Sequence, residues 1–272
     1  MEKGASYQLV LHQMAKEFEH IKFRIDDRVA RITFARPPLN VFNITMMREI
    51  GEALNECLPL RDLAAIVFDA APDTRAFSAG VAVEEHASET VFQMLDSFHS
   101  VFRLLAQISR PVIAVVDGPA LGGGCELVAA CDIVIASERA RFGQPEIKLG
   151  VFPPVAVILL PRIIGEKRAR ELIMLGDMID SAEALRLGLV NYVVAGAELE
   201  PKLESVLVKV RDLSASALAM TRAALDLGGQ TNFQSALTEV ENLYFHELMK
   251  TEDAHEGVRS FMEKRKPEWR HR

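Results

Sequence analysis

The sequence predicts an α/β fold in which the last third of the chain is helical. Short, nearly all-apolar runs that suit buried strands alternate with helical periodicities in the first half. After Pro153 the pattern is helical almost to the end of the chain. The 272 residues are 49% hydrophobic and 25% charged, which is the balance of a globular protein with a sizeable core.

The first half of the chain alternates predicted strands with predicted helices. Asp26-Asp27 joins the first two strands as a turn, and Thr45 is expected to cap the helix that follows them. Pro111 ends a second, apolar-faced helix, and a glycine-rich turn at 118–124 leads into a short third helix. We predict strands over residues 20–25, 29–34, 64–69, 112–117 and 133–136, and helices over 46–57, 89–108 and 126–130.

The second half of the chain shows no internal repeat and no low-complexity linker. Its predicted helices cover residues 158–164, 167–175, 182–187, 198–213, 215–227, 232–249 and 253–263. No clear boundary separates independently folding domains. We therefore divide the chain into an N-terminal extension at 1–18, an α/β core at 19–195 and a helical C-terminal region at 196–272.

Charge and composition argue against several classes of function. The formal net charge of -7 disfavours a general nucleic-acid binder, because phosphate binding requires a basic face. The longest apolar stretches are too short to span a bilayer, so no membrane partner is expected. The three cysteines have neither disulfide nor zinc-ligand spacing, and charges interrupt the N-terminal segment, unlike a signal peptide. These features predict a cytoplasmic protein.

Residues 110–150 carry the features that point to chemistry. This segment contains a strand, the glycine-rich turn, a short helix with Glu126, a further strand, and Glu146 after a proline. A lone glycine triplet or a lone helical glutamate is weak evidence, since turns use glycine freely and glutamates are usually solvated. A dinucleotide site is disfavoured, because no G-x-G-x-x-G follows the strand and no acidic residue is placed for a ribose.

Two motifs held at a fixed spacing are more specific. Residues 120–127 read Ala-Leu-Gly-Gly-Gly-Cys-Glu-Leu, and residues 143–147 read Gly-Gln-Pro-Glu-Ile. Together with the tight turn at residues 77–81, they resemble the crotonase (enoyl-CoA hydratase/isomerase) superfamily over residues 20–269. The resemblance implies a crotonase-like spiral of strand-strand-helix units with a helical C-terminal trimerisation part. It also implies a homotrimer or a dimer of trimers.

The resemblance further implies hydration of a coenzyme A thioester. Glu126 and Glu146, 20 residues apart (146 − 126), stand where family hydratases carry their acid/base pair. The N–H groups of Val81 and Gly123 match the two oxyanion donors, which stabilise negative charge on the thioester oxygen. The substrate-binding residues implied in the same way are Ala79, Gly80, Ala82, Val83, Glu84, Gly122, Val151, Phe152 and Lys264.

The reaction implied by the resemblance needs no metal and no cofactor, because coenzyme A is part of the substrate. Isomerases of the family commonly keep only one carboxylate, so the presence of both Glu126 and Glu146 favours a hydratase. An isomerase or an acyl-CoA hydrolase on the same fold is the alternative enzyme. A non-catalytic scaffold is the alternative outside enzymes.

The sequence departs from the family pattern in two places. Ala82 and Glu84 stand where family hydratases usually carry an aspartate and often a lysine, so the CoA phosphates must be bound elsewhere. The cations at 264–266 are candidates, and an ordinary helix-end cluster is the alternative. The proline-containing loop at 150–161 and residues 213–217 resemble cyclohexa-1,5-dienecarbonyl-CoA hydratases, which implies that thioester as the substrate.

Three further residues are expected either to lie near the site or to hold the fold together. His86 follows the first tight turn and is expected either near the acyl pocket or on a surface loop. Asp132 and Arg110 match scaffold positions of the family and are expected to form hydrogen bonds or ion pairs that hold the fold.

Overall fold

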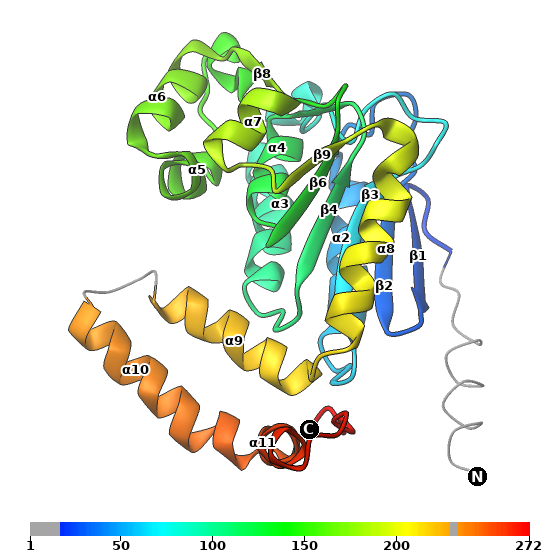
Figure 1. Ribbon diagram of the computed structural model, residues 1–272. Helices are drawn as coiled ribbons and strands as arrows, with labels where there is room; N and C mark the ends of the chain where they lie inside the picture. Colours follow the sequence, from blue (N-terminus) through cyan, green and yellow to red (C-terminus); the bar gives the residue numbers. More distant parts are fainter. Residues whose placement is uncertain (1–16, 229–232) are drawn as a thin grey trace.

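The computed structural model describes residues 17–228 and 233–272. Most of the predicted N-terminal extension at 1–18 lies outside the described residues, as does the start of the helix predicted at 232–249. The predicted α/β class is confirmed, with a mixed main sheet, helices on both of its faces and a helical C-terminal part (Figure 1). The division of the chain into three regions stays a prediction.

The main sheet has six strands in the order β1-β2-β3-β4-β6-β9. β1 runs antiparallel to β2, and the remaining neighbours are parallel, as expected where helices connect successive strands. The strands are β1 (Ile21–Asp26), β2 (Val29–Phe34), β3 (Ala65–Ala70), β4 (Val112–Val116), β6 (Ile133–Ser137) and β9 (Tyr192–Val194).

Both faces of this sheet are buried, so its central strands are apolar on both sides. Helices α2 (Ile44–Cys57) and α3 (Val91–Leu105) pack on one face, where alternate side chains such as Phe34 and Phe68 point. Helix α8 (Leu199–Arg211) covers the other face and contacts the intervening side chains, including Val67 (Figure 1). The continuous apolar run of β3 is the sequence signature of this double burial.

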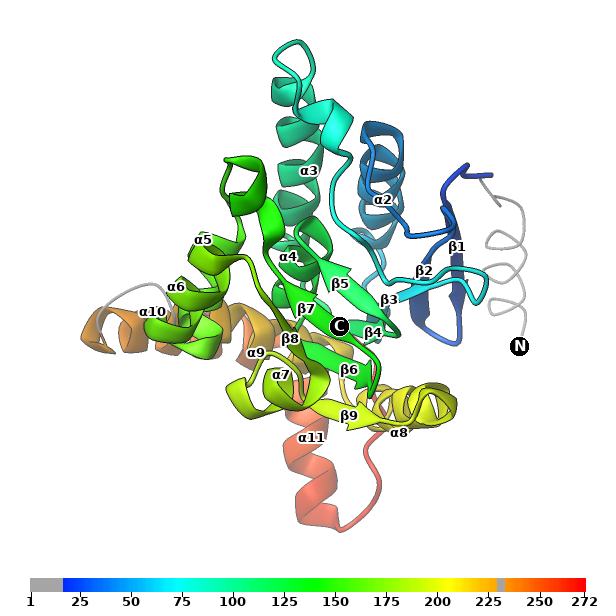
Figure 2. The ribbon, with the colours of Figure 1, turned by 90° about the horizontal axis from the view of Figure 1, so that it is seen from above.

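A second sheet of three short strands, β5 (Pro119–Leu121), β7 (Arg141–Gly143) and β8 (Met178–Asp180), lies beside the main sheet (Figure 2). β5 leads directly into helix α4 (Gly123–Ala129), and β7 leads into the 3-10 helix η2 (Pro145–Leu149). Parallel pairing of β5 with β7 therefore brings the starts of α4 and η2 together. Helices α5 (Ala156–Ile164), α6 (Glu166–Leu175) and α7 (Ser181–Leu187) complete this part.

The C-terminal helices extend away from the α/β core (Figure 1). They are α9 (Ala215–Gly228), α10 (Phe233–His246) and α11 (Glu252–Glu263), with the 3-10 helix η4 (Leu248–Lys250) between the last two. Large apolar side chains on them are exposed to solvent in the single chain, among them Leu225, Phe245, Val258, Phe261 and Met262. Such a concentration of exposed apolar surface is typical of an interaction face.

Scaffold contacts tie these layers together. Asp132 accepts a hydrogen bond from the N–H of Val112 at 2.7 Å and pairs with Arg222 of α9. Arg110 donates to the carbonyls of Arg61 and Ala215. The structural roles predicted for Asp132 and Arg110 are therefore confirmed. Of the described helices, none is both long and apolar enough to cross a bilayer.

Two sequence predictions were wrong. Thr45 does not cap α2: the helix starts at Ile44, two residues before its predicted start, and Asn43 Oδ1 accepts from the N–H of Met46 at 2.9 Å. The sequence also gave no sign of β5, β7, β8 and β9, and the last two interrupt a region predicted to be helical. Each has only three residues, which is too short for a period-two pattern, so pairing with neighbours defines these strands.

Candidate active site

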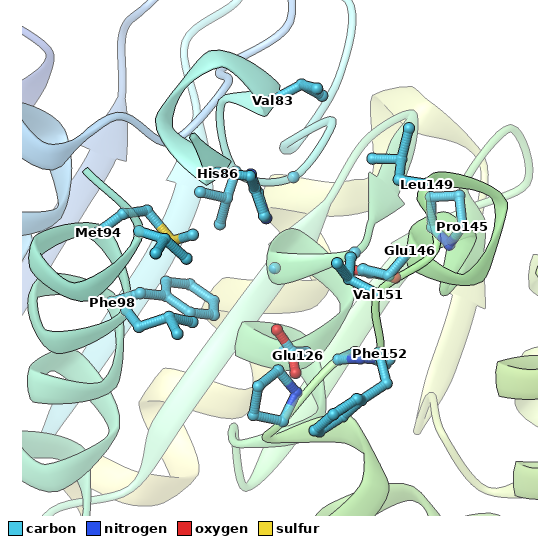
Figure 3. Close-up of a pocket in the computed structure, with 18 of the residues that line it drawn as sticks. Val83, His86, Met94, Phe98, Glu126, Pro145, Glu146, Leu149, Val151 and Phe152 are labelled. Carbon is cyan, nitrogen blue, oxygen red and sulfur yellow. The ribbon is translucent and has the colours of Figure 1, made fainter. Parts of the chain in front are cut away.

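A pocket of about 390 Å³ lies between α3, the start of α4 and the loop that follows η2 (Figure 3). Apolar side chains and glycines form most of its wall, and His86, Glu126 and Glu146 are its polar side chains. Such a cavity, largely apolar with a few convergent polar groups, is typical of a small-molecule site. The wall comprises Ala79, Gly80, Val81, Val83, His86, Val91, Met94, Leu95, Phe98, Gly122, Gly123, Glu126, Pro145, Glu146, Leu149, Gly150, Val151, Phe152, Pro153 and Pro154.

Two glycine-containing segments meet at the floor of the pocket through their backbones. The N–H of Ser78 donates to the carbonyl of Pro119 at 3.2 Å, and the N–H of Leu121 donates to the carbonyl of Ser78 at 2.9 Å. Gly80 has a φ of 101°, and a Cβ there would lie 3.1 Å from the carbonyl oxygen of Leu121. Only glycine combines this backbone conformation with so close an approach.

The N–H groups of Val81 and Gly123 are free to bind a ligand. Phe42 donates to Gly80 and accepts from Ala82, so the intervening N–H of Val81 points to the opposite side of this extended segment. Gly123 is the first residue of α4, where an N–H has no acceptor within the helix. In the described part of the chain, neither group donates to a protein acceptor.

Glu126 lies on α4 and is 2% exposed. Its Oε1 accepts hydrogen bonds from the N–H groups of Val155 and Ala156, both at 2.8 Å. The pKa of Glu126 is raised to about 7, chiefly by burial; the charge of Glu146 contributes to the rise, and the hydrogen bonds from the two N–H groups oppose it. Figure 3 shows the carboxyl group of Glu126 directed into the pocket.

Glu146 follows Pro145 at the start of η2, on the side of the pocket next to Gly122. Its Oε2 is buried and has no hydrogen-bond partner within the described residues. Burial raises the pKa of Glu146 to about 6. Gly122 has a φ of 50°, and a Cβ there would lie 2.4 Å from Glu146 Oε1, so a glycine is required beside this carboxyl group.

The structure brings most of the predicted site residues into this one pocket. Ala82 and Glu84 are not part of its wall: Ala82 is buried, and Glu84 is exposed on the 3-10 helix η1 (Val83–His86). Lys264 follows the last residue of α11, outside the pocket of its own chain, so its predicted role in binding CoA stays a prediction. The pocket contains Ala79, Gly80, Val81, Val83, Gly122, Gly123, Glu126, Glu146, Val151 and Phe152.

The sequence left part of the pocket wall unrecognised. Met94 and Phe98 lie on the apolar stripe of α3, which the sequence predicted only as a core face. In the proline-containing loop that the sequence did single out, Pro153 and Pro154 line the pocket, whereas Val155 and residues 156–157 do not and lie at the start of α5. His86, whose position the sequence left open, is a wall residue.

Known proteins resemble this chain over nearly its whole length. A sequence profile of the enoyl-CoA hydratase/isomerase family matches residues 24–272. A probable enoyl-CoA hydratase of Mycobacterium leprae is 42% identical over 251 residues, which cover 90% of this chain and 95% of that protein. A cyclohexa-1,5-dienecarbonyl-CoA hydratase of Thauera aromatica is 36% identical over 247 residues, covering 91% of this chain and 95% of the relative.

Solved structures extend the likeness to three dimensions. The crystal structure of an enoyl-CoA hydratase from Mycobacterium smegmatis superimposes with a TM-score of 0.86 at 31% sequence identity. The match covers 92% of this chain and 99% of the other.

The raised pKa of Glu126 has a consequence for stability. The folded protein keeps a proton on this carboxyl up to about pH 7, whereas the unfolded chain releases it near pH 4.5, so stability falls as the pH rises between these values. Glu126→Gln removes the buried charge and keeps an oxygen that can accept from Val155 and Ala156. We expect the variant to match the wild type at pH 5 and to unfold at a higher temperature at pH 8.

Thermal unfolding followed by circular dichroism at both pH values measures this difference. Glu89→Gln, the same change at an exposed position, is the control and should leave the melting temperature unaltered at either pH. The burial argument is contradicted if the difference in melting temperature between Glu126→Gln and the wild type is no larger at pH 8 than at pH 5.

Proposed function

Because the chain belongs to the enoyl-CoA hydratase/isomerase family and is an enzyme of the hydratase type, we propose that it adds water to the conjugated double bond of an enoyl- or dienoyl-CoA thioester. One observation carries the proposal: a buried and a half-buried carboxyl group, both with raised pKa values, share a pocket with two unpaired backbone N–H groups. Carboxyl groups with shifted pKa values beside unpaired hydrogen-bond donors in a cleft are typical of catalytic sites.

The N–H groups of Val81 and Gly123 serve as the oxyanion hole. Attack of water on a conjugated thioester moves negative charge onto the thioester oxygen as an enolate forms. Two N–H groups held in place by the fold stabilise this charge without reorganising, and loss of one such donor costs about 10²–10³ in rate. The thioester oxygen would lie about 2.7–3.1 Å from both nitrogens.

Glu126 and Glu146 transfer the protons. One carboxyl group removes a proton from the attacking water, and the other supplies a proton to the α-carbon of the enolate. Their pKa values of about 7 and about 6 lie near neutrality, where a carboxyl group can both accept and release a proton. No metal or redox cofactor takes part in this scheme, and coenzyme A enters as part of the substrate.

We expect Glu126→Gln and Glu146→Gln each to lower kcat for hydration by about 10²–10⁴, the range for a lost general acid or base. The double variant should add little, because catalytic groups that act as a unit are not additive. Loss of ultraviolet absorbance of the conjugated thioester measures the rate, and Glu89→Gln is the matched surface control. Near-wild-type turnover in either single variant would refute the assignment.

Product analysis separates hydration from the alternative reactions. In ¹⁸O-labelled water a hydratase yields a hydroxyacyl-CoA that carries the label in its new hydroxyl group. An isomerase moves the double bond without incorporating water, and a hydrolase releases free coenzyme A. A scaffold without activity would do none of these.

The acyl group is proposed to be a flat ring, with cyclohexa-1,5-dienecarbonyl-CoA as the substrate. Support comes from Pro153 and Pro154 in the pocket wall, since proline fixes φ and stiffens the loop. The N–H groups that follow them hold Glu126, so the loop has little freedom to widen for a flexible chain. The Thauera aromatica relative, whose name gives this substrate, adds to the support.

We expect kcat/KM for cyclohexa-1,5-dienecarbonyl-CoA to exceed that for crotonyl-CoA. The difference should be modest, because apolar fit contributes about 10–200-fold per methylene-sized change in contact. Steady-state kinetics on the two thioesters measure the ratio. A clear preference for crotonyl-CoA would remove the ring substrate and leave the hydratase assignment standing.

The chain is proposed to form a homotrimer or a dimer of trimers through its C-terminal helices. Phe261 and Met262 on α11 are 85% and 76% exposed in the single chain, and other apolar side chains on α9–α11 are also open to solvent. Association would bury this surface, whose transfer from water is favourable by about 25 cal/mol per Å². In such an assembly Lys264 is a candidate for binding the CoA of a neighbour.

Light scattering should report a mass three or six times the 30.2 kDa of the chain. Phe261→Glu places a charge on the exposed apolar face and should reduce the mass, because burying an unpaired charge is costly. Phe92→Glu is the matched control at an 84% exposed phenylalanine on α3 and should leave the mass unchanged. A stable monomer of the wild type at micromolar concentration would contradict the proposal.

A further inference from the structure

His86 is a polar side chain in the pocket that the proposed proton transfers do not use. Of the polar side chains in the wall, Glu126 and Glu146 act on the reacting double bond. His86 lies near Met94 and Phe98 of α3, on the side of the cavity away from Glu126 (Figure 3). Its ring therefore borders the part of the pocket that is otherwise apolar.

The hydrogen bond of His86 determines which of its nitrogens carries the proton. Nδ1 lies 3.0 Å from the carbonyl oxygen of Ala82. A carbonyl oxygen only accepts hydrogen bonds, so Nδ1 must be the donor and carry the hydrogen. In the neutral ring, Nε2 is then a hydrogen-bond acceptor. Within the described residues Nε2 has no hydrogen-bond partner and is not among the buried unpaired atoms.

The segment that carries His86 is held in place from two sides. The carboxylate of Glu85 accepts from the N–H of Ile44 at the start of α2, at 3.0 and 3.1 Å. The hydroxyl of Thr90 donates to the carbonyl of Glu85 at 3.0 Å. These bonds fix η1 against α2 and α3, so the imidazole is a positioned acceptor rather than a mobile surface group.

We propose that His86 is a specificity-determining residue, whose Nε2 accepts a hydrogen bond from a hydroxyl group on the acyl part of the substrate. The inference rests on the proposed function, because it assumes an acyl thioester in the pocket. An acceptor in an otherwise apolar wall favours a ligand that brings a donor to it, by the net free energy of one hydrogen bond. Among thioesters of the same carbon skeleton, ring or linear, those that carry a hydroxyl group beyond the double bond are then favoured over those that lack it.

The test compares pairs of substrates that differ by one hydroxyl group. Crotonyl-CoA, 2-pentenoyl-CoA and 2-hexenoyl-CoA are each measured against the same thioester hydroxylated on its last carbon. In the wild type we expect kcat/KM to favour the hydroxylated member of at least one pair by about 3- to 10-fold, the effect of one neutral hydrogen bond. His86→Leu should abolish this ratio.

His86→Gln should restore part of the ratio, because the glutamine Oε1 can supply an acceptor near the position of Nε2. Met94→Leu, a change of shape without a polar group in the same wall, should alter both members of each pair alike. If His86 only holds η1 through Ala82, then His86→Leu lowers both rates equally and the ratio stays the same.

The possible outcomes are distinct. Equal kcat/KM within all three wild-type pairs, or a wild-type ratio that survives in His86→Leu, overturns the role of His86. Absence of hydration of every thioester, cyclohexa-1,5-dienecarbonyl-CoA included, instead refutes the proposed function itself.

Discussion

The site depends on the close backbone approach of two segments that are about 40 residues apart in sequence. Ser78 exchanges hydrogen bonds with Pro119 and Leu121, and this pairing sets the N–H of Val81 beside the start of α4. Side chains cannot intervene: a Cβ on Gly124 would lie 2.7 Å from the carbonyl oxygen of Ser78. The short distance between the two backbones therefore requires glycine, and this close approach also sets the positions of both N–H groups.

The same approach accounts for the burial of the two carboxyl groups. β5 pairs with β7, so the helices that follow them, α4 and η2, start side by side and bring Glu126 and Glu146 into one pocket. Burial in an apolar wall disfavours the charged forms, and the repulsion between them adds to the effect on Glu126. A short sheet thus produces the proximity, and its apolar surroundings produce the raised pKa values.

Much of this arrangement could be predicted from sequence, and the remainder depends on long-range contacts. β2 was predicted at its observed bounds, because apolar runs between turn residues are a local signal. Glu126, Glu146 and the two glycine turns were identified from motif spacing. The strands β5, β7, β8 and β9 are defined by pairing alone, and Asn43 takes the place of Thr45 as the cap because the helix starts two residues earlier. Met94 and Phe98 looked like core residues because wall and core share one apolar stripe.

Glu126 has a second role that links the chemistry to the shape of the pocket. Helix α5 has no side-chain cap of its own, and the free N–H groups of Val155 and Ala156 at its start are bound by Glu126 Oε1 instead. An ionised carboxylate accepts such bonds more strongly than a protonated carboxyl group. The proton that Glu126 exchanges in the proposed reaction therefore changes its hold on α5 and on the adjoining wall residues Pro153 and Pro154. In the proposed reaction, proton transfer and the fit of the acyl group would thus be coupled through this one side chain.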